Sequence, residues 1–432
     1  MLSFVHLSDI HFNKYSGDPY DVDNDLRSML LYDVRENFHK SIDSCNGILI
    51  CGDIVFSGKE KEYAIASEFL RTLCDKLGLP DSSVYCVPGN HDVDQDVPRG
   101  EYFIESTQGQ LAATTTMDAF DASLAKIAHS EISAELLYEP IKNYNKTFAG
   151  KFNCNLNSKN LCREFLIDLD HKYKLSIWCI NSTLISNHHD QDDRKVERPM
   201  RIGRAQMPVP KENTVYLSIC HHPPQCWYDP EKILAEKMNK RVAIQLYGHK
   251  HIQTIERKGE SIIVGSGATQ PVRGDDDWLP RYNWITLETK QDKLFVSIFP
   301  RVLENECKFE ADPILGGGKL CETFELNLYE EPDEGSAKEL DKEPDLKTED
   351  LTITEPVAIA DTEGKYYRRD LIYSFLMLPY YVRLKIISMF NLGRPEDEGK
   401  QHADIVGYLI DRANISNQLD QLYYEIQRGK RW

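Results

Sequence analysis

Residues 83–92 read SVYCVPGNHD, an apolar run that ends in a tight turn carrying three polar side chains. The run from Ser83 to Val87 is short and rich in β-branched and aromatic residues, which predicts a buried strand. Gly89 permits a sharp turn after it, and Asn90, His91 and Asp92 follow at once. A strand that delivers an amide, an imidazole and a carboxylate to one turn indicates a site at its carboxyl end.

The same arrangement of an apolar run followed by a polar motif occurs at four other places. These motifs are Asp9-Ile10-His11, Gly52-Asp53, His221-His222-Pro223-Pro224 and Gly248-His249-Lys250-His251. Ligands of open α/β sheets gather outside the carboxyl ends of the strands, so side chains distant in sequence converge there. Each short motif alone is also typical of a surface turn or of packed histidines. Five of them, each after a predicted strand, favour one shared site.

Predicted strands and helices alternate through the first 300 residues, which indicates a layered α/β fold. The strands are expected at Leu2–Leu7, Gly47–Cys51, Ser83–Val87, Leu175–Ile180, Thr214–Cys220, Val242–Tyr247 and Ser261–Val264, and a helix at Lys61–Leu77. Two later runs, Asn283–Leu287 and Leu294–Ile298, predict an antiparallel pair. Two insertions interrupt the pattern: residues 97–165 are mostly helical, and residues 185–212 are polar and basic. Such insertions often form the walls of a site.

Composition limits the class of protein. The 432 residues are too many for one compact core, and 41% are hydrophobic. A formal charge of −18 argues against a protein that coats nucleic acid or anionic membranes through a general positive field. Eleven cysteines without a CxxC pair indicate reduced thiols. With neither a signal peptide nor an apolar run of membrane length, we expect a cytoplasmic protein with no membrane partner.

The C-terminal quarter changes character twice. Residues 330–350 contain ten acids and three lysines, a composition that cannot bury a core, and we expect an acidic linker over 330–360. Helical patterns return over 361–432 and predict a small all-α domain there. The catalytic part is therefore expected to occupy residues 1–329.

The donor set of the five motifs suits divalent cations. Carboxylates, imidazoles and one amide oxygen make a mixed N/O set appropriate to manganese, iron, zinc or nickel rather than calcium. Residues at i and i+2 beyond a strand end can aim at one ion once the chain turns. This spacing accounts for Asp9 with His11, and it lets His249 and His251 reach the same site.

Taken together, the motifs resemble the calcineurin-like metallophosphoesterase superfamily, with its pattern D-x-H, G-D, G-N-H-D/E, H and G-H-x-H. The resemblance covers roughly residues 1–300 and implies a four-layer αββα sandwich with two divalent cations, manganese being expected first. It implies that Asp9, His11 and His251 hold the first metal and that Asp53 bridges both.

The resemblance also implies ligands of the second metal, namely Asn90, His221 and His249. His221 is preferred to His222 because it directly ends the predicted strand Thr214–Cys220, where the family places its ligand.

The resemblance implies a reaction as well. A hydroxide bridging two metals about 3.5–4 Å apart would attack phosphorus in line, while His91 supports the departing alkoxide. Asp92 would then orient His91. Both residues are therefore expected to be catalytic.

The surroundings of the motifs favour phosphodiesters over phosphoproteins. Phe56-Ser57-Gly58 stands where the Ser/Thr protein phosphatases of the family have Asp-Arg-Gly, and Asp92 replaces their Glu. The chain is more similar to the branch that holds cyclic-nucleotide phosphodiesterases and DNA-repair exonucleases. We expect Arg201, Arg204 and His222 to contact the substrate, and the basic insertion suggests that this substrate is DNA. The alternative for the insertion is a solvated loop.

Aromatic residues after the late motifs are candidates for base stacking, or for ordinary packing. They are Trp227, Tyr228, Trp278 and Tyr282.

The helical tail resembles the death-fold-like effector-associated adaptor domains of bacterial defence proteins. The match rests on the runs 409–414 and 419–426, and it implies recruitment by a protein partner through 361–432. The first expectation is a nuclease acting as the effector of a defence or signalling system. The alternatives are a cyclic-nucleotide phosphodiesterase or phosphomonoesterase, a tail that only caps the catalytic domain, and a non-catalytic interaction scaffold.

Overall fold

The computed structural model describes residues 1–328 apart from 191–198, 272–278, 305–306, 313–314 and 317. Beyond them it describes Phe375, Ile386, Phe390, Ile410, Ala413, 421–424 and Ile426. The chain divides into two compact units, Met1–Glu331 and Pro332–Trp432. The acidic linker and most of the predicted helical tail lie outside the described residues. Within the described part, no helix has the length and apolar character needed to cross a membrane.

The first sheet has seven strands in the order β12-β11-β10-β1-β2-β3, with β13 also paired to β11. Their bounds are β1 Leu2–Leu7, β2 Gly47–Ile50, β3 Val84–Cys86, β10 Arg281–Lys290, β11 Lys293–Val302, β12 Glu310–Ala311 and β13 Glu322–Asn327. β1, β2 and β3 are parallel, and β10 runs antiparallel to both β1 and β11. The predicted antiparallel pair is therefore confirmed, and it does extend a sheet.

The second sheet has six strands in the order β4-β5-β6-β7-β9-β8. Their bounds are β4 Arg163–Asp168, β5 Lys174–Cys179, β6 Thr214–Cys220, β7 Ile244–Tyr247, β8 Thr254–Lys258 and β9 Ser261–Gly265. The four central strands are parallel, and β4 and β8 close the edges in antiparallel pairing.

Alternate residues of each central strand face two different cores. In β1, Leu2 and Phe4 join the apolar layer between the two sheets, whereas Val5 and Leu7 face the helices outside. This alternation follows from the two-residue period of a strand. A strand buried on both faces reads as a continuous apolar run, which is why these strands were visible in the sequence.

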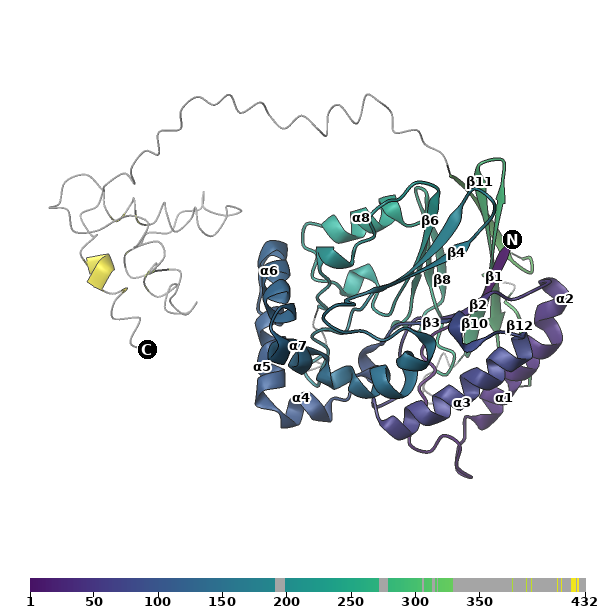
Figure 1. Cartoon of the computed structure of the whole chain (residues 1–432), viewed down its shortest axis with the longest axis horizontal. Helices are drawn as coiled ribbons and strands as arrows, with labels where there is room; N and C mark the ends of the chain where they lie inside the picture. Colours follow the sequence, from purple (N-terminus) through teal and green to yellow (C-terminus); the bar gives the residue numbers. More distant parts are fainter. Residues whose placement is uncertain are drawn as a thin grey trace. The chain divides into compact units, whose positions relative to one another are not determined.

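Helices cover the outer face of each sheet (Figure 1). α1 (Asn24–Asp33), the short α2 (His39–Ser41) and α3 (Glu60–Leu77) lie over the first sheet, and α8 (Ile233–Arg241) lies over the second. α3 begins with an acidic first turn and ends at Gly78 in the left-handed conformation (φ +67°). The predicted four-layer αββα sandwich is confirmed.

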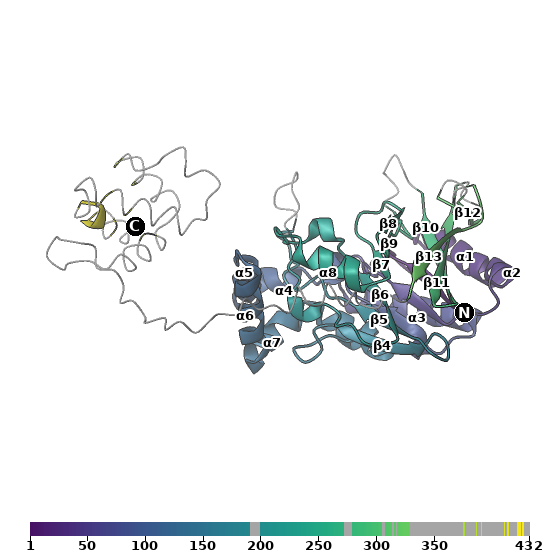
Figure 2. The ribbon, with the colours of Figure 1, turned by 90° about the horizontal axis from the view of Figure 1, so that it is seen from above.

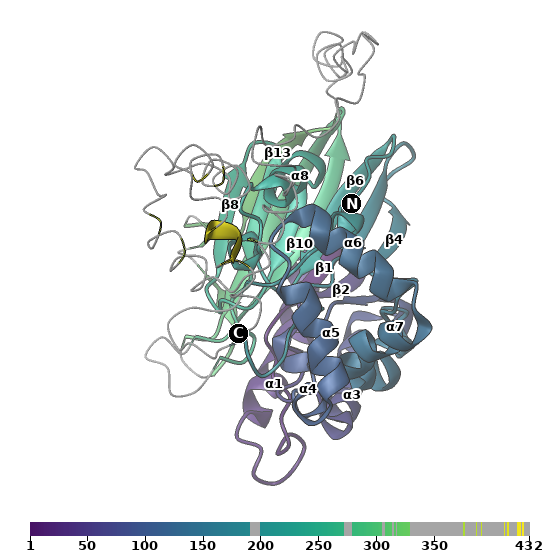
Figure 3. The same ribbon diagram turned by 90° about the vertical axis from the view of Figure 1, so that its left-hand side faces the viewer.

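The helical insertion stands beyond the strand ends. It contains α4 (Asp96–Gly100), α5 (Tyr102–Ala112), α6 (Met117–Ala128) and α7 (Glu131–Tyr138), and Figures 2 and 3 show α5, α6 and α7 grouped at one end of the sandwich. Their apolar faces enclose Leu111, Phe120 and Leu124 together with Leu184 and Ile185 of the segment that follows β5. The insertion therefore has a small core of its own.

Candidate metal centre

Five turns that leave parallel strands bring the polar motifs to one edge of the sandwich. The turns after β1 and β2 continue to pair beyond the strands, since Asp9 N donates to Gly52 O (3.1 Å) and His11 N to Asp53 O (3.0 Å). The turns after β6 and β7 are joined in the same way by Gly248 N and His221 O (3.0 Å). Backbone hydrogen bonds, rather than flexible loops, therefore fix where the motif side chains start.

Most of the predicted ligands stand on left-handed backbone. Positive φ values occur at Asp9 (53°), His11 (52°), Asp53 (50°), His249 (71°) and His251 (56°). For a residue with a Cβ this conformation costs roughly 1–2 kcal/mol, and strain of this kind is concentrated at functional sites. In the Asp9–His11 and His249–His251 turns, both members of the pair have this left-handed conformation, which lets side chains two residues apart point into the cluster.

Gly52 is required by close approach as well as by its φ of +84°. A Cβ at this position would lie 2.7 Å from the backbone nitrogen of Gly89 and 2.8 Å from Nδ1 of His221. The glycine before Asp53 thus lets three of the motif turns meet.

The first ligand group consists of Asp9, His11 and His251. Oδ1 of Asp9 lies 3.3 Å from Nε2 of His251. The other oxygen, Oδ2, accepts from Ser8 Oγ at 2.5 Å and from His249 N at 3.3 Å. Hydrogen bonds to Oδ2 thus hold the Asp9 carboxylate in place, while Oδ1 points toward the other ligands of the first group.

The second ligand group gathers around the Asn90 amide. Its Oδ1 lies 3.0 Å from Nε2 of His221 and 3.1 Å from Nδ1 of His249. His249 and His251 therefore enter different groups, although both come from one turn. The family resemblance implies His249 at the second metal and His251 at the first, and this allocation stays a prediction.

Asp53 lies between the two groups. Its Oδ2 is 3.3 Å from Nε2 of His221 and 4.0 Å from Nε2 of His11, and its Oδ1 accepts from His91 N at 2.8 Å. Burial opposes ionisation, but the charges of His221, His91 and His11 hold the pKa of Asp53 well below its usual range. The carboxylate is placed as a bridging ligand would be.

Within the described residues, histidine side chains are the ion-pair partners of the two carboxylates of this cluster. Asp9 and Asp53 are buried. Asp9 Oδ1 has the His251 imidazole as its polar neighbour, and the buried Nδ1 of His11 takes part in no hydrogen bond. Burial opposes protonation of His221, yet the charge of Asp53 raises the pKa of His221 to about 9. Buried anions need such compensation, and divalent cations would provide it through these ligand atoms. The residues therefore fit a metal centre.

His91 lies beside this cluster, and its neighbours correct one expectation. Nδ1 of His91 lies 2.8 Å from the carbonyl oxygen of Phe56. Asp92 does not touch the His91 ring, because its carboxylate accepts from Ile54 N, Val55 N, Gly89 N and Tyr63 Oη. The prediction that Asp92 orients His91 directly is wrong; Asp92 fixes the turn that carries Phe56.

The surroundings of Asp92 also alter its acidity. Burial and the charge of Asp53 raise the pKa of Asp92 to about 7, against the opposing effect of its backbone donors.

The two arginines expected at the substrate have partners within the protein. Arg201 is 8% exposed; it donates to Ala112 O (2.7 Å) and Thr114 O (2.6 Å), and it stacks 3.6 Å from the ring centroid of Tyr228. Arg204 pairs with Asp118 and with Asp121 on α6. Both guanidinium groups tie the second insertion to the helical insertion, which is a structural role that charge alone did not reveal.

His222 lies inside the ligand cluster. It forms a group with His221 and His249, and its Nδ1 lies 2.8 Å from Ser182 Oγ. The ring is 1% exposed, and burial together with the charges of His221 and His249 lowers its pKa well below the usual range. The structure places His222 beside the second ligand group. A contact between His222 and the substrate stays a prediction.

The aromatic residues proposed for stacking are mostly packed. Trp227 is buried and donates to His222 O at 2.8 Å, Tyr282 is buried against Asp33, and Trp278 lies outside the described residues. Sequence reasoning missed Phe56, whose side chain is 51% exposed and whose ring centroid lies 5.0 Å from that of His91. Its position three residues after Asp53 was the available signal.

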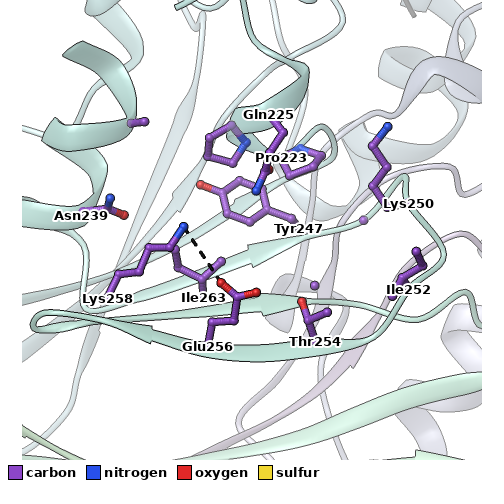
Figure 4. A pocket seen from close by; sticks show the side chains of 14 residues that line it. Pro223, Gln225, Asn239, Tyr247, Lys250, Ile252, Thr254, Glu256, Lys258 and Ile263 are labelled. Atoms are coloured by element: carbon purple, nitrogen blue, oxygen red, sulfur yellow. Dashed lines mark ion pairs between the residues drawn. The ribbon is translucent and has the colours of Figure 1, made fainter. Parts of the chain in front are cut away.

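A pocket of about 290 Å³ adjoins the turn that carries His249. It opens between α8 and the β8–β9 hairpin, with Tyr247 and Ile263 among its apolar lining and Lys250 at one side (Figure 4). The pocket shares the Gly248–Ile252 turn with the ligand cluster.

Comparisons with known proteins show what this chain is similar to. A family model described as calcineurin-like phosphoesterase matches residues 2–253. A Bacillus subtilis (strain 168) protein, described as the uncharacterized metallophosphoesterase-like protein YydB, is 24% identical over 254 residues, which are 57% of this chain and 48% of that protein. The chain thus spans about half the length of this relative.

Two solved structures give weaker likenesses. Wild-type Vps29 of Entamoeba histolytica is 12% identical with a TM-score of 0.31, over 76% of this chain and 100% of its own. GAP50 of Plasmodium is 11% identical with a TM-score of 0.34, over 76% of this chain and 89% of its own. Scores this low carry no argument about activity. The family model matches more than half of the residues, so the chain belongs to the calcineurin-like phosphoesterase family.

Proposed function

We propose that this chain is a dinuclear metal-dependent phosphodiesterase. The observation that carries the proposal is the position of Asp53, whose one carboxylate faces His11 of the first group and His221 of the second. Asp9, His11 and His251 would hold one cation, and Asn90, His221 and His249 the other, with manganese expected first. Two bound cations would activate a water molecule and neutralise phosphoryl oxygens.

The protein's own residues position the ester and assist the leaving group. Nδ1 of His91 faces a carbonyl oxygen, which can only accept, so this nitrogen must donate. Nε2 is therefore the ring nitrogen that can carry the second proton of an imidazolium and give it to the departing oxygen, which leaves the ring neutral. The hydrogen bond from His91 N to Asp53 Oδ1 fixes the distance between His91 and the central carboxylate.

Phe56 supports a nucleotide-type ester. Its half-exposed ring lies beside His91, where the leaving group would depart, and an aromatic face in that position suits stacking of a base. DNA and cyclic nucleotides share this chemistry. The basic insertion no longer argues for DNA through Arg201 and Arg204, so the nuclease proposal rests on Phe56.

The biological setting is a separate proposal. Recruitment through residues 361–432 into a bacterial defence or signalling system is supported by the resemblance of the tail sequence alone.

The test is metal-dependent hydrolysis with matched variants. Chelator-treated protein should hydrolyse bis-p-nitrophenyl phosphate only after Mn²⁺ is added. Asp53→Asn should lower the rate by at least about a hundredfold, since the metals supply several kcal/mol. Asp96→Asn, an exposed carboxylate on α4, is the control and should retain wild-type activity. Wild-type activity in Asp53→Asn contradicts the proposal.

A substrate series then separates the candidates. Turnover of single-stranded DNA supports the nuclease, and turnover of cyclic AMP alone supports the small-substrate enzyme. Hydrolysis of p-nitrophenyl phosphate without any diester activity contradicts the diester assignment.

A further inference from the structure

A second group of metal-type side chains lies on the helical insertion. Glu105 on α5 and the neighbouring His188 and His189, in the segment after β5, bring one carboxylate oxygen and two imidazole nitrogens within 4.8 Å of one another. All three residues are partly exposed, so an ion can reach them. The proposed hydrolysis uses none of the three.

The two imidazoles converge on one oxygen. Oε1 of Glu105 lies 2.7 Å from Nε2 of His189 and 3.7 Å from Nε2 of His188. The rings themselves lie close, with centroids 4.0 Å apart and planes inclined by 40°. A single ion pair needs only one imidazole, and two protonated rings at this separation would repel each other. A cation between the three atoms could bind both nitrogens and the carboxylate together.

The elements that carry these ligands are already docked to each other. Gln108, one turn after Glu105 on α5, donates to Ser186 O at 3.0 Å, and its Oε1 accepts from Asn187 Nδ2 at 2.7 Å. Gln108 and Asn187 are 1% and 2% exposed. The histidines directly follow this buried contact, so the site stands on a fixed framework, as a metal site requires.

We propose that Glu105, His188 and His189 bind a divalent transition metal ion, separate from the reaction centre. Two imidazoles and one carboxylate are a ligand set that zinc accepts, with a fourth position left for water. The ion would tie α5 to the segment after β5. That segment begins beside the ligand cluster, where Ser182 Oγ meets His222 Nδ1 at 2.8 Å, so the metal would steady one wall of the centre.

Metal counting on the full chain tests the site. Wild type, Glu105→Gln and His189→Ala are stripped with chelator, dialysed against the same low zinc concentration, and assayed by elemental analysis. We expect one zinc equivalent fewer per chain in both variants. The control is His129→Ala, a histidine that ends α6 in the same insertion, and it should keep the wild-type count. Equal counts in wild type and Glu105→Gln overturn the proposal.

Hydrogen exchange gives a second readout that does not depend on catalysis. At a zinc concentration about 100 times Kd, opening of α5 that releases the ion should slow by up to about 100-fold. The amides of Tyr102–Ala112 should show this slowing in wild type and not in Glu105→Gln, a substitution of nearly the same size at a partly exposed position. Equal protection of both proteins overturns the proposal, because zinc at the reaction centre is common to both.

Discussion

The carbonyl oxygen of Phe56 sets the orientation of the His91 ring, 2.8 Å from Nδ1. A carbonyl can only accept, so Nδ1 donates and the opposite ring nitrogen faces away from the turn. This hydrogen bond keeps a proton on Nδ1 and holds the imidazole ring in one orientation. His91 thereby presents one nitrogen to the reacting ester.

This orientation predicts a leaving-group effect. His91→Asn should lower kcat by about 10²–10⁴-fold for a dinucleotide, whose alkoxide needs a proton. The decrease should be smaller for bis-p-nitrophenyl phosphate, whose phenolate leaves without one. Steady-state rates on both substrates, at saturating Mn²⁺, measure the difference. An equal decrease on both would mean that His91 acts as a metal ligand, in line with its place in a group with His11 and Asp53.

Asp92 should behave as a structural residue that affects His91 from a distance. Its two oxygens accept from Gly89 N at 2.8 Å, from Ile54 N and Val55 N at 3.1 Å, and from a tyrosine hydroxyl. Asp92→Asn turns an amide NH₂ toward backbone donors, which should lower the free energy of unfolding by about 1–3 kcal/mol.

Urea denaturation measures this change. Asp96→Asn, at an exposed position, should change stability by less than about 1 kcal/mol. Unchanged stability in Asp92→Asn would contradict the role assigned to this carboxylate.

His91 and Asp92 also show which parts of the site can be predicted from the sequence. Ligands such as Asp53 and Asn90 stand directly after apolar strands, and parallel strands end at one edge, so their convergence follows from order alone. The acceptor of His91 is a backbone carbonyl 35 residues away, and a carbonyl has no letter in the sequence. The Gly89-Asn90-His91-Asp92 motif indicates that His91 and Asp92 are functional, but it does not indicate which groups they contact.

Arg204 shows a similar limit in predicting ion pairs from the sequence. The sequence shows a basic segment, but the carboxylates that pair with Arg204 lie on α6, at Asp118 and Asp121, more than 80 residues earlier. Local composition predicts where charge is plentiful and does not predict which charges are already paired. The strands β4 and β8 were missed for a related reason, since both are edge strands with partly exposed, mixed side chains.

Arg204→Ala should therefore leave substrate binding intact. Its guanidinium is held by two carboxylates, and removing it takes away no contact to the ester. KM for a single-stranded oligonucleotide should change by less than about twofold. A rise of about tenfold or more, with kcat unchanged, would return Arg204 to the substrate site.

His6 gives the fold a defined dependence on pH. The residue is buried in β1, with Nε2 3.3 Å from Cys51 Sγ and Nδ1 3.2 Å from Asn283 Nδ2. Burial lowers the pKa of His6 to about 3, against the opposing charge of Asp9. In the unfolded chain an imidazole titrates near about 6.5.

Between these two values the unfolded chain binds a proton that the folded His6 does not. The free energy of unfolding should therefore fall as pH drops below about 6.5, by up to roughly 1.4 kcal/mol per pH unit for this group. His6→Gln removes the titration and keeps a polar side chain beside Asn283. From about pH 7.5 to about pH 5.5, wild type should lose roughly 1 kcal/mol more than His6→Gln. Urea denaturation of both proteins in the presence of chelator measures this difference in the free energy of unfolding. The ligand histidines are the same in both proteins, so their titration cancels in the difference. A difference that stays constant over this range would mean that His6 takes up its proton in the folded state.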